Sequence, residues 1–118
     1  MKIKNIDIDF NFLDADNVEK FENEAKKVVE KTNNEEIKEL SYAEALRLEC
    51  NIVDEFLDNV FGEGISEKIF EGKKDLMEHL KVFQDIVDEK NSKQQELQNL
   101  YNRYAPNRTQ RRKSKKNV

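Results

Sequence analysis

The chain has 118 residues, of which 36% are apolar and 39% charged, and its 25 Asp and Glu outnumber its 21 Lys and Arg. This length and composition suit one small domain with a thin core and a heavily charged surface. No apolar run is long enough for a membrane-spanning helix or a signal-peptide core, which excludes those classes. The single cysteine, Cys50, cannot form an internal disulfide. We therefore expect a soluble protein of a reducing, intracellular compartment.

The first thirteen residues predict a small β element. Apolar side chains alternate there with polar ones, at Ile6, Ile8, Phe10 and Phe12. This period of two is that of a strand with one buried face. Residues 1–4 can supply a short partner strand with the turn at residues 4–5, because asparagine tolerates the positive φ of tight hairpin turns.

The first helix is predicted to begin at Asp14 or Asp16, either of which can cap it, and to end at residues 32–34. Its apolar positions are spaced as on one helix face, at Val18, Phe21, Ala25, Val28 and Val29. Residues 33–39 are polar and acidic, so we expect them to form a connection.

The second helix is predicted to begin at Ser41, because Glu44 three residues later completes a capping box. It is the most apolar segment and is expected to form the centre of the core through Leu46, Ile52, Val53, Phe56, Leu57, Val60 and Phe61. Gly62 is placed to end it. Residues 62–64 then form a turn, and residues 66–70 form one or two helical turns.

Asp75 is predicted to cap a long last helix. Its first apolar residues are spaced four, three and four apart, at Leu76, Leu80, Phe83 and Val87. The spacing of three and four residues, which forms an apolar seam, then continues through polar residues. The segment is therefore either one helix whose second half leaves the core or a helix broken at residues 90–93. We expect the partner contact to involve Leu97, Leu100, Tyr101 and Tyr104, with Phe83 and Val87 if the seam is continuous. The alternative is that these side chains complete the core of the monomer.

The end of the chain differs in charge from everything before it. Residues 107–118 contain no acid and six basic side chains, Arg108, Arg111, Arg112, Lys113, Lys115 and Lys116. The preceding part has a formal charge of −10, so the net charge of −4 is the sum of an acidic body and a basic tail. Because the tail has no apolar residue before Val118, burial cannot offset its ordering entropy. We expect a disordered tail that docks on acidic protein faces or serves solubility.

Groups that could perform catalysis or bind metals are few. His79 is the only histidine and Cys50 the only cysteine, so metal sites and Cys–His–acid sites lack their usual members. We expect a buried Cys50 and a surface His79. Residues 62–64 lack the Lys-Ser/Thr that follows a phosphate-binding loop, and acidic pairs are inevitable among 25 acids. The sequence predicts a non-enzymatic protein without cofactor or metal.

Together these elements predict a mainly α fold with a minor β part. Residues 1–104 form an acidic domain of three or four helices with a short strand or hairpin within residues 1–13. Residues 105–118 form the flexible basic tail. Nucleic acid is an unlikely partner, because the acidic body repels it and no aromatic residues alternate with the basic ones.

Two stretches together resemble a known group of proteins. One is VFGEGISEKIF at residues 60–70, preceded by Phe56 and Asp58, and the other is the ending YAPNRTQRR at residues 104–112. With the N-terminal IDIDF that leads into residues 14–16, they make the chain similar, over nearly its whole length, to small proteins from the tail modules of long-tailed phages and prophages of Gram-positive bacteria. The ending also resembles the C-termini of many phage tail assembly chaperones.

The resemblance implies a specific activity. Tail assembly chaperones coat the tape measure protein, a very long helical chain, before tube subunits polymerise around it. The implied protein works in the cytoplasm of the bacterial host, binds the tape measure or another tail protein, and forms homo-oligomers without a membrane partner. Recognition of a helix in an apolar groove would supply the contacts.

Two other classes have the same composition. A minor virion component, such as an adaptor, would remain in finished particles, whereas a chaperone would be absent from them. A small phage effector that binds a host defence or regulatory protein would also be acidic and soluble, for example through carboxylates spaced like DNA phosphates. A nucleic-acid binder would show an affinity that falls steeply with salt.

Overall fold

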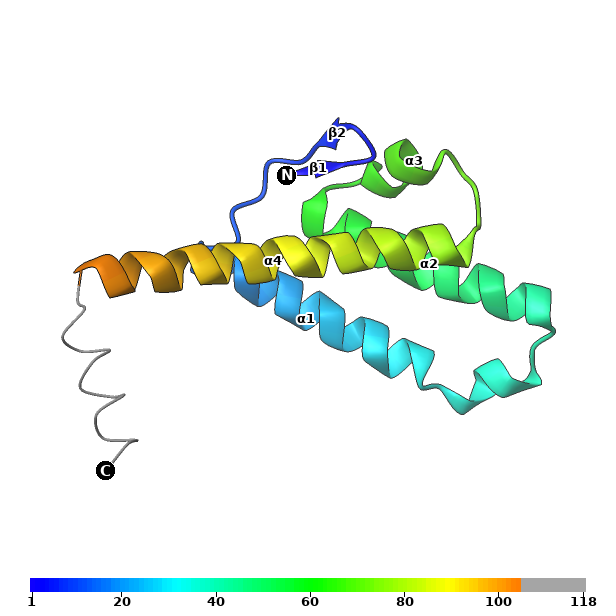
Figure 1. Ribbon diagram of the computed structural model, residues 1–118. Coiled ribbons are helices and arrows are strands. Elements are labelled where there is room, and N and C mark those ends of the chain that lie inside the picture. Colours follow the sequence, from blue (N-terminus) through cyan, green and yellow to red (C-terminus); the bar gives the residue numbers. More distant parts are fainter. Residues whose placement is uncertain (105–118) are drawn as a thin grey trace, which may run out of the picture.

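The computed structural model describes residues 1–104, which form a short hairpin and four α-helices (Figure 1). The elements are β1 (Lys2–Ile3), β2 (Ile6–Asp7), α1 (Ala15–Thr32), the 3₁₀-helix η1 (Glu35–Glu39), α2 (Tyr42–Phe61), α3 (Ile65–Phe70) and α4 (Leu76–Tyr104). The predicted mainly α fold with an N-terminal hairpin is confirmed. The predicted disorder of the basic tail concerns residues 105–118, which lie outside this description.

The hairpin turns at the two residues that the sequence indicated. Lys4 and Asn5 both have positive φ, 48° and 69°, as a tight two-residue turn requires. The strand is shorter than predicted, since β2 ends at Asp7. The alternation nevertheless persists beyond it, because Ile8 and Phe12 are buried.

The first two helix caps agree with the sequence analysis, and the structure selects Asp14 over Asp16 for the first of them. Asp14 accepts a hydrogen bond from the backbone N–H of Asn17 (3.1 Å) at the start of α1. The Ser41 hydroxyl accepts from the backbone N–H of Glu44 (3.2 Å) at the start of α2. Each bond satisfies one of the backbone donors that a helix leaves unpaired at its N-terminus.

Helix α2 forms the centre of the core, as predicted, and α1, α3 and α4 all pack against it. Its residue Leu57 is completely buried. The core cluster consists of Ile3, Ile8, Phe12, Phe21, Val53, Phe56, Leu57, Val60, Ile69, Phe70, Val82 and Ile86. Every element except η1 and β2 contributes to it, so one small core fixes all four helices.

A chain of phenyl rings connects the N-terminal segment to the last helix. Phe12 contacts Phe21 of α1 with ring centroids 5.4 Å apart, and Phe21 contacts Phe56 of α2 at 5.5 Å. Phe56 in turn contacts Phe83 of α4 at 5.1 Å. The first two contacts are edge-to-face and the third is tilted, arrangements that add to the stabilisation from burial.

Polar contacts join α1 to α2 along their outer edge. Glu24 accepts hydrogen bonds from Lys27 (3.0 Å) and from Asn59 of α2 (3.2 Å). Burial raises the pKa of the Glu24 carboxyl, but these hydrogen bonds and the charges of Lys27 and Lys31 outweigh it, so the pKa lies below its ordinary value. The carboxylate is therefore ionised at neutral pH and holds the two helices together.

Helix α4 is continuous from Leu76 to Tyr104, which excludes the predicted alternative of a break at residues 90–93. Asp75 caps it by accepting from the backbone N–H of Glu78 (3.2 Å), as predicted. No proline or glycine interrupts the helix, and the polar residues in its middle are compatible with a helix that faces water on all sides.

The face that α4 buries differs from the predicted seam. Its buried residues are His79, Val82 and Ile86, whereas Leu80 of the seam is 49% exposed. Both sets are spaced three or four apart, so the helix is rotated relative to the prediction. His79, which the sequence analysis placed on the surface, thereby turns into the core.

Candidate interaction surface

The C-terminal half of α4 extends beyond the rest of the molecule (Figure 1). Its large apolar side chains are exposed, by 37% at Leu97, 45% at Leu100, 59% at Tyr101 and 79% at Tyr104. Residues three and four apart lie on one helix face, so these four form a continuous strip, here called the distal stripe. All residues from 94 through 101 are exposed, so within the described residues this part of α4 is uncovered on every side.

The other two predicted contact residues lie elsewhere. Phe83 and Val87 are half-buried and pack against the core cluster. The alternative of a completed monomer core thus applies to these two, while the four residues of the distal stripe remain exposed. One helix therefore contributes its first half to the core and its second half to a surface.

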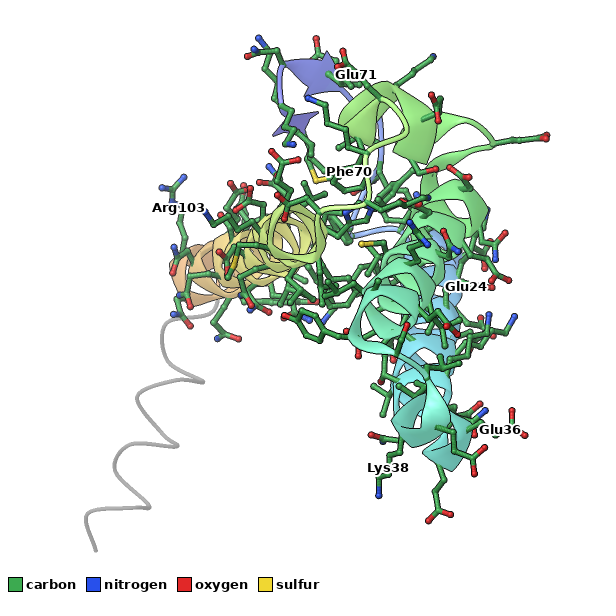
Figure 2. The ribbon with its side chains drawn as sticks, turned by 90° about the vertical axis from the view of Figure 1, so that its right-hand side faces the viewer. Glu24, Glu36, Lys38, Phe70, Glu71 and Arg103 are labelled. Atoms are coloured by element: carbon green, nitrogen blue, oxygen red, sulfur yellow. The ribbon has the colours of Figure 1, made fainter. Side chains whose placement is uncertain are left out.

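In Figure 2, the end of α4 and the α1–α2 connection lie on opposite sides of the molecule. Arg103, next to the distal stripe, points away from the body of the molecule, and Glu36 and Lys38 of η1 lie at the opposite side. Arg103 is exposed in the last turn of α4. The end of the helix thus presents a positive charge beside its tyrosines.

A second apolar surface, a shallow groove of about 500 Å³, lies between the N-terminal ends of α2 and α4. It is lined by Tyr42, Leu46, Lys74, Asp75, Leu76, Met77 and Leu80, and is here called the proximal groove. Tyr42 is 81% exposed and Met77 63% exposed. Sequence reasoning missed this surface because it depends on how α2 and α4 meet, and no local pattern carries that information.

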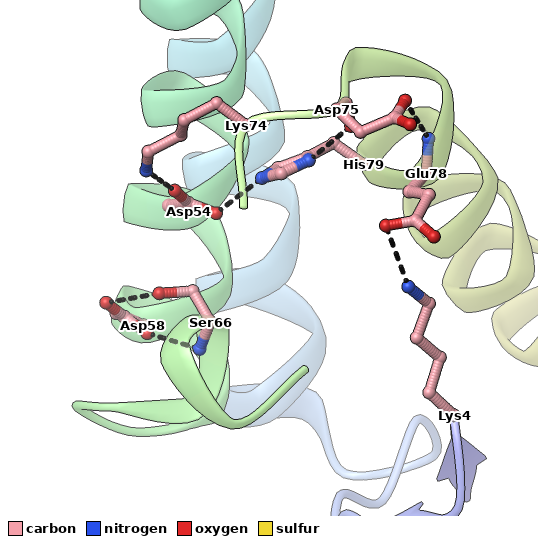
Figure 3. A network of polar contacts seen from close by, with 8 residues as sticks. All are labelled: Lys4, Asp54, Asp58, Ser66, Lys74, Asp75, Glu78 and His79. Carbon is pink, nitrogen blue, oxygen red and sulfur yellow. Dashed lines mark hydrogen bonds and ion pairs between the residues drawn. The ribbon is translucent and has the colours of Figure 1, made fainter. Parts of the chain in front are cut away.

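A polar network that shares Lys74 and Asp75 with the proximal groove surrounds His79 (Figure 3). Nδ1 of His79 lies 2.6 Å from the backbone oxygen of Asp75, and Nε2 lies 2.9 Å from Oδ1 of Asp54. Lys74 donates to the other oxygen of Asp54 at 2.6 Å. Both ring nitrogens therefore face oxygen acceptors, which explains how the only histidine can be buried without an unsatisfied polar atom.

The expectation of a surface His79 is wrong, since its side chain is completely buried. The physical reason is the rotation of α4 together with the acceptors that Asp54 and Asp75 provide. The expectation of a buried Cys50 is confirmed. Burial raises the pKa of the Cys50 thiol and the charge of Asp54 raises it further, against the opposing charge of Lys74. A protonated, buried thiol is a poor nucleophile, and the contacts of His79 serve to join helices.

The turn between α2 and α3 contains a second polar contact (Figure 3). Asp58 of α2 accepts from the backbone N–H of Ser66 at 2.9 Å and from its hydroxyl at 3.0 Å. Gly64, which precedes α3, has φ 88° and provides no side-chain cap. Asp58 therefore supplies from a neighbouring helix the acceptor that the N-terminus of α3 lacks.

Three further predictions concern metal ions, membrane spans and the basic residues. Within residues 1–104, no cluster of three or more His, Cys, Asp or Glu side chains could hold a metal ion. No helix in this part is both long and apolar enough to span a membrane. The six basic residues predicted to dock on acidic faces belong to residues 105–118, outside the described part of the chain.

Comparison with known proteins places the chain in a family. No curated protein and no solved structure matches it. One family matches residues 4–115, a span that includes the hairpin turn, all four helices and most of the basic tail. The chain therefore belongs to the family described as "Family of unknown function (DUF6673)".

Proposed function

We propose that this protein is a non-enzymatic phage tail assembly chaperone that binds the tape measure protein and neighbouring copies of itself through apolar helix faces. The observation that carries the proposal is the uncovered half of α4 with its distal stripe. The proposal also rests on the resemblance of residues 60–70 and 104–112 to tail-module proteins. Its site of action is the cytoplasm of the bacterial host.

The geometry of the distal stripe suits a helical partner. Its side chains recur every three or four residues along a straight helix, which is the spacing at which two helices pack together. Tyr101 and Tyr104 combine a large apolar ring with a hydroxyl that tolerates water. A strip of four side chains gives a small contact, and small contacts dissociate readily. A coat that must leave before the tail tube forms requires such contacts.

The charge distribution supports the same function. The acidic body keeps many copies soluble at the high local concentration of a coat. The six basic residues at 108–116 would attract the tail to acidic faces of a neighbouring copy or of the tape measure. Replacing these six by glutamine is expected to weaken association while leaving the helical content unchanged.

The test is co-expression with the tape measure protein of the same tail module. We expect the two proteins to purify together, and the yield of soluble tape measure protein to rise severalfold. The variant with Leu100→Asp and Tyr104→Asp should lose both effects. Val29→Asp is the matched control, because Val29 is a 57% exposed apolar residue that belongs to α1 and not to α4.

Three outcomes would contradict the proposal. Failure to purify with the tape measure protein removes its central claim. Equal loss in the Val29→Asp control would show that the stripe has no special role. Detection of the protein in purified virions by mass spectrometry would favour a minor virion component, since a chaperone leaves before the tail is complete.

A further inference from the structure

The two apolar surfaces lie at opposite ends of the molecule. The distal stripe is at the C-terminal end of α4, and the proximal groove is where α2 and α4 begin. Figure 1 shows these ends far apart along the long direction of the molecule, whose greatest extent is 57 Å. A single chain therefore cannot bring its own stripe into its own groove.

The shapes of the two surfaces are complementary. The distal stripe lies on a projecting helix and is convex, whereas the proximal groove is a hollow of about 500 Å³ between two helices. Exposed Tyr42, Met77 and Leu80 provide apolar contacts at the groove. A helix carrying aromatic anchors is the kind of ligand that such a groove accepts. Two distal stripes packed together would instead leave both grooves empty.

The charges beside the two surfaces are also complementary. Two charged residues line the groove, Lys74 and Asp75. Lys74 is paired with Asp54, so the negative charge of Asp75 remains on the lining. Glu44 adds a further acid in the first turn of α2. Arg103 lies beside Tyr104, the last residue of the distal stripe, and the sequence after Tyr104 contains six basic residues and no acid. The groove therefore carries a negative charge at Asp75, and the helix with the stripe carries a positive charge at Arg103 in its last turn.

We propose that the distal stripe of one copy docks in the proximal groove of a second copy. This inference rests on the contact between copies in the proposed function, and it specifies its geometry. Because the contact joins two different surfaces, an assembly that does not close on itself keeps one stripe and one groove free at its ends, so copies add in a row beyond a dimer. A row of copies can cover a partner much longer than one molecule.

The test uses two variants with substitutions only at exposed positions. The stripe-blocked variant contains Leu100→Asp and Tyr104→Asp, and the groove-blocked variant contains Met77→Asp and Leu80→Asp. Circular dichroism checks that both keep the helical content of the wild type. Val29→Asp again serves as the control for an added charge at an exposed apolar site.

Sedimentation velocity over a wide range of concentrations distinguishes the possible contacts. The wild type and the Val29→Asp control should grow beyond twice the 14.0 kDa mass of the chain as concentration rises. Each blocked variant alone should remain monomeric at concentrations where the wild type associates. Mixed in equal amounts, the two variants should form a complex of twice 14.0 kDa and nothing larger, because one intact stripe meets one intact groove.

Other outcomes overturn the inference. A groove-blocked variant that still dimerises alone would show that stripes pair with each other. A mixture that forms no complex, or a wild type that is monomeric throughout, would exclude the stripe–groove contact. If the mixture forms its complex but no tape measure protein purifies with the wild type, the proposed chaperone function fails and this inference stands. If the tape measure protein purifies with the wild type but the mixture forms no complex, the stripe binds the partner and only this inference is removed.

Discussion

The imidazole of His79 lies flat against the phenyl ring of Phe70, with ring centroids 3.6 Å apart and an angle of 10° between the planes. This contact joins the first turns of α4 to α3, and the bond from His79 to Asp54 joins them to α2. One buried side chain therefore connects three helices. The contact also fixes the base of the proximal groove, because Leu76 and Leu80 lie on the same helical turns as His79.

Replacing His79 by leucine is expected to lower the free energy of unfolding by about 2–4 kcal/mol, because the polar contacts with Asp54 and Asp75 and a stacked ring are lost in a fully buried site. Urea unfolding followed by circular dichroism measures the change. Lys74→Met is the control: Lys74 bonds to the same carboxylate, but its side chain is 38% exposed, so its loss should cost less than about 1 kcal/mol.

A double-mutant cycle with Asp54→Asn tests whether His79 acts through this carboxylate. If it does, the loss of stability in the double variant should be smaller than the sum of the two single losses by about 1–2 kcal/mol. Strict additivity would show that His79 contributes independently of Asp54, through its packing on Phe70 and its contact with Asp75.

The contact between Asp58 and Ser66 predicts a second large effect at a site that is not in the hydrophobic core. Asp58→Ala should cost about 1–3 kcal/mol, because it removes both acceptors from the first turn of α3. Ser66→Ala removes only the bond to the hydroxyl and should cost about half as much. Glu55→Ala, one turn earlier on α2, is the control, and Asp58→Ala with no greater loss than this control would contradict the assignment.

These contacts explain which parts of the fold could be predicted from the sequence. Signals confined to a few neighbouring residues were sufficient for the caps at Ser41 and Asp75 and for the turn at residues 4–5, and they narrowed the first cap to Asp14 or Asp16. In each case a short polar side chain or a tolerated positive φ fixes the local backbone whatever packs around it. The end of α2 at Gly62 was predictable for the same reason.

Features that depend on distant residues could not be predicted in the same way. Leu80 and Val82 each belong to a set of apolar residues spaced three or four apart. The spacing alone therefore did not determine which face of α4 turns to the core. The acceptors that allow His79 to be buried come in part from α2, 25 residues earlier. The proximal groove depends on the same packing of α2 on α4. The exposure of the distal stripe was one of two outcomes that the sequence left open. So small a domain offers few partners to the second half of α4, and the four side chains are exposed.

The buried thiol of Cys50 leads to a third prediction. Because its pKa is raised by burial and by Asp54, the folded protein holds the thiol proton more tightly than the unfolded chain does. Iodoacetamide at pH 8 should therefore modify the native protein at least about 100-fold more slowly than the protein in urea at the same pH. Mass spectrometry measures both rates. Equal rates would show that Cys50 is accessible and ionised.

The raised pKa of the Cys50 thiol also predicts how the stability of the protein depends on pH. A thiol that ionises less readily in the folded state contributes to stability at neutral pH, and this contribution is lost once the pH rises above about 9, where unfolded cysteine ionises. The wild type should therefore lose stability between pH 8 and 10 more steeply than Cys50→Ala. Parallel profiles for the two proteins would contradict the raised pKa.

The two halves of α4 are expected to differ in local stability, although they form one helix. His79, Val82 and Ile86 anchor the first half on α2, whereas residues 94–101 are exposed on every side. A helix without tertiary contacts opens readily, because propensity alone contributes little. In hydrogen exchange at low protein concentration, amides of residues 95–104 should therefore exchange at least about 100-fold faster than those of residues 82–90. Raising the concentration should slow exchange in residues 95–104 of the wild type, where the distal stripe becomes covered, and should have no effect in the stripe-blocked variant. Slow exchange along the whole helix at the lowest concentration would mean that the second half is stable by itself, and its exposure would then say nothing about a missing partner.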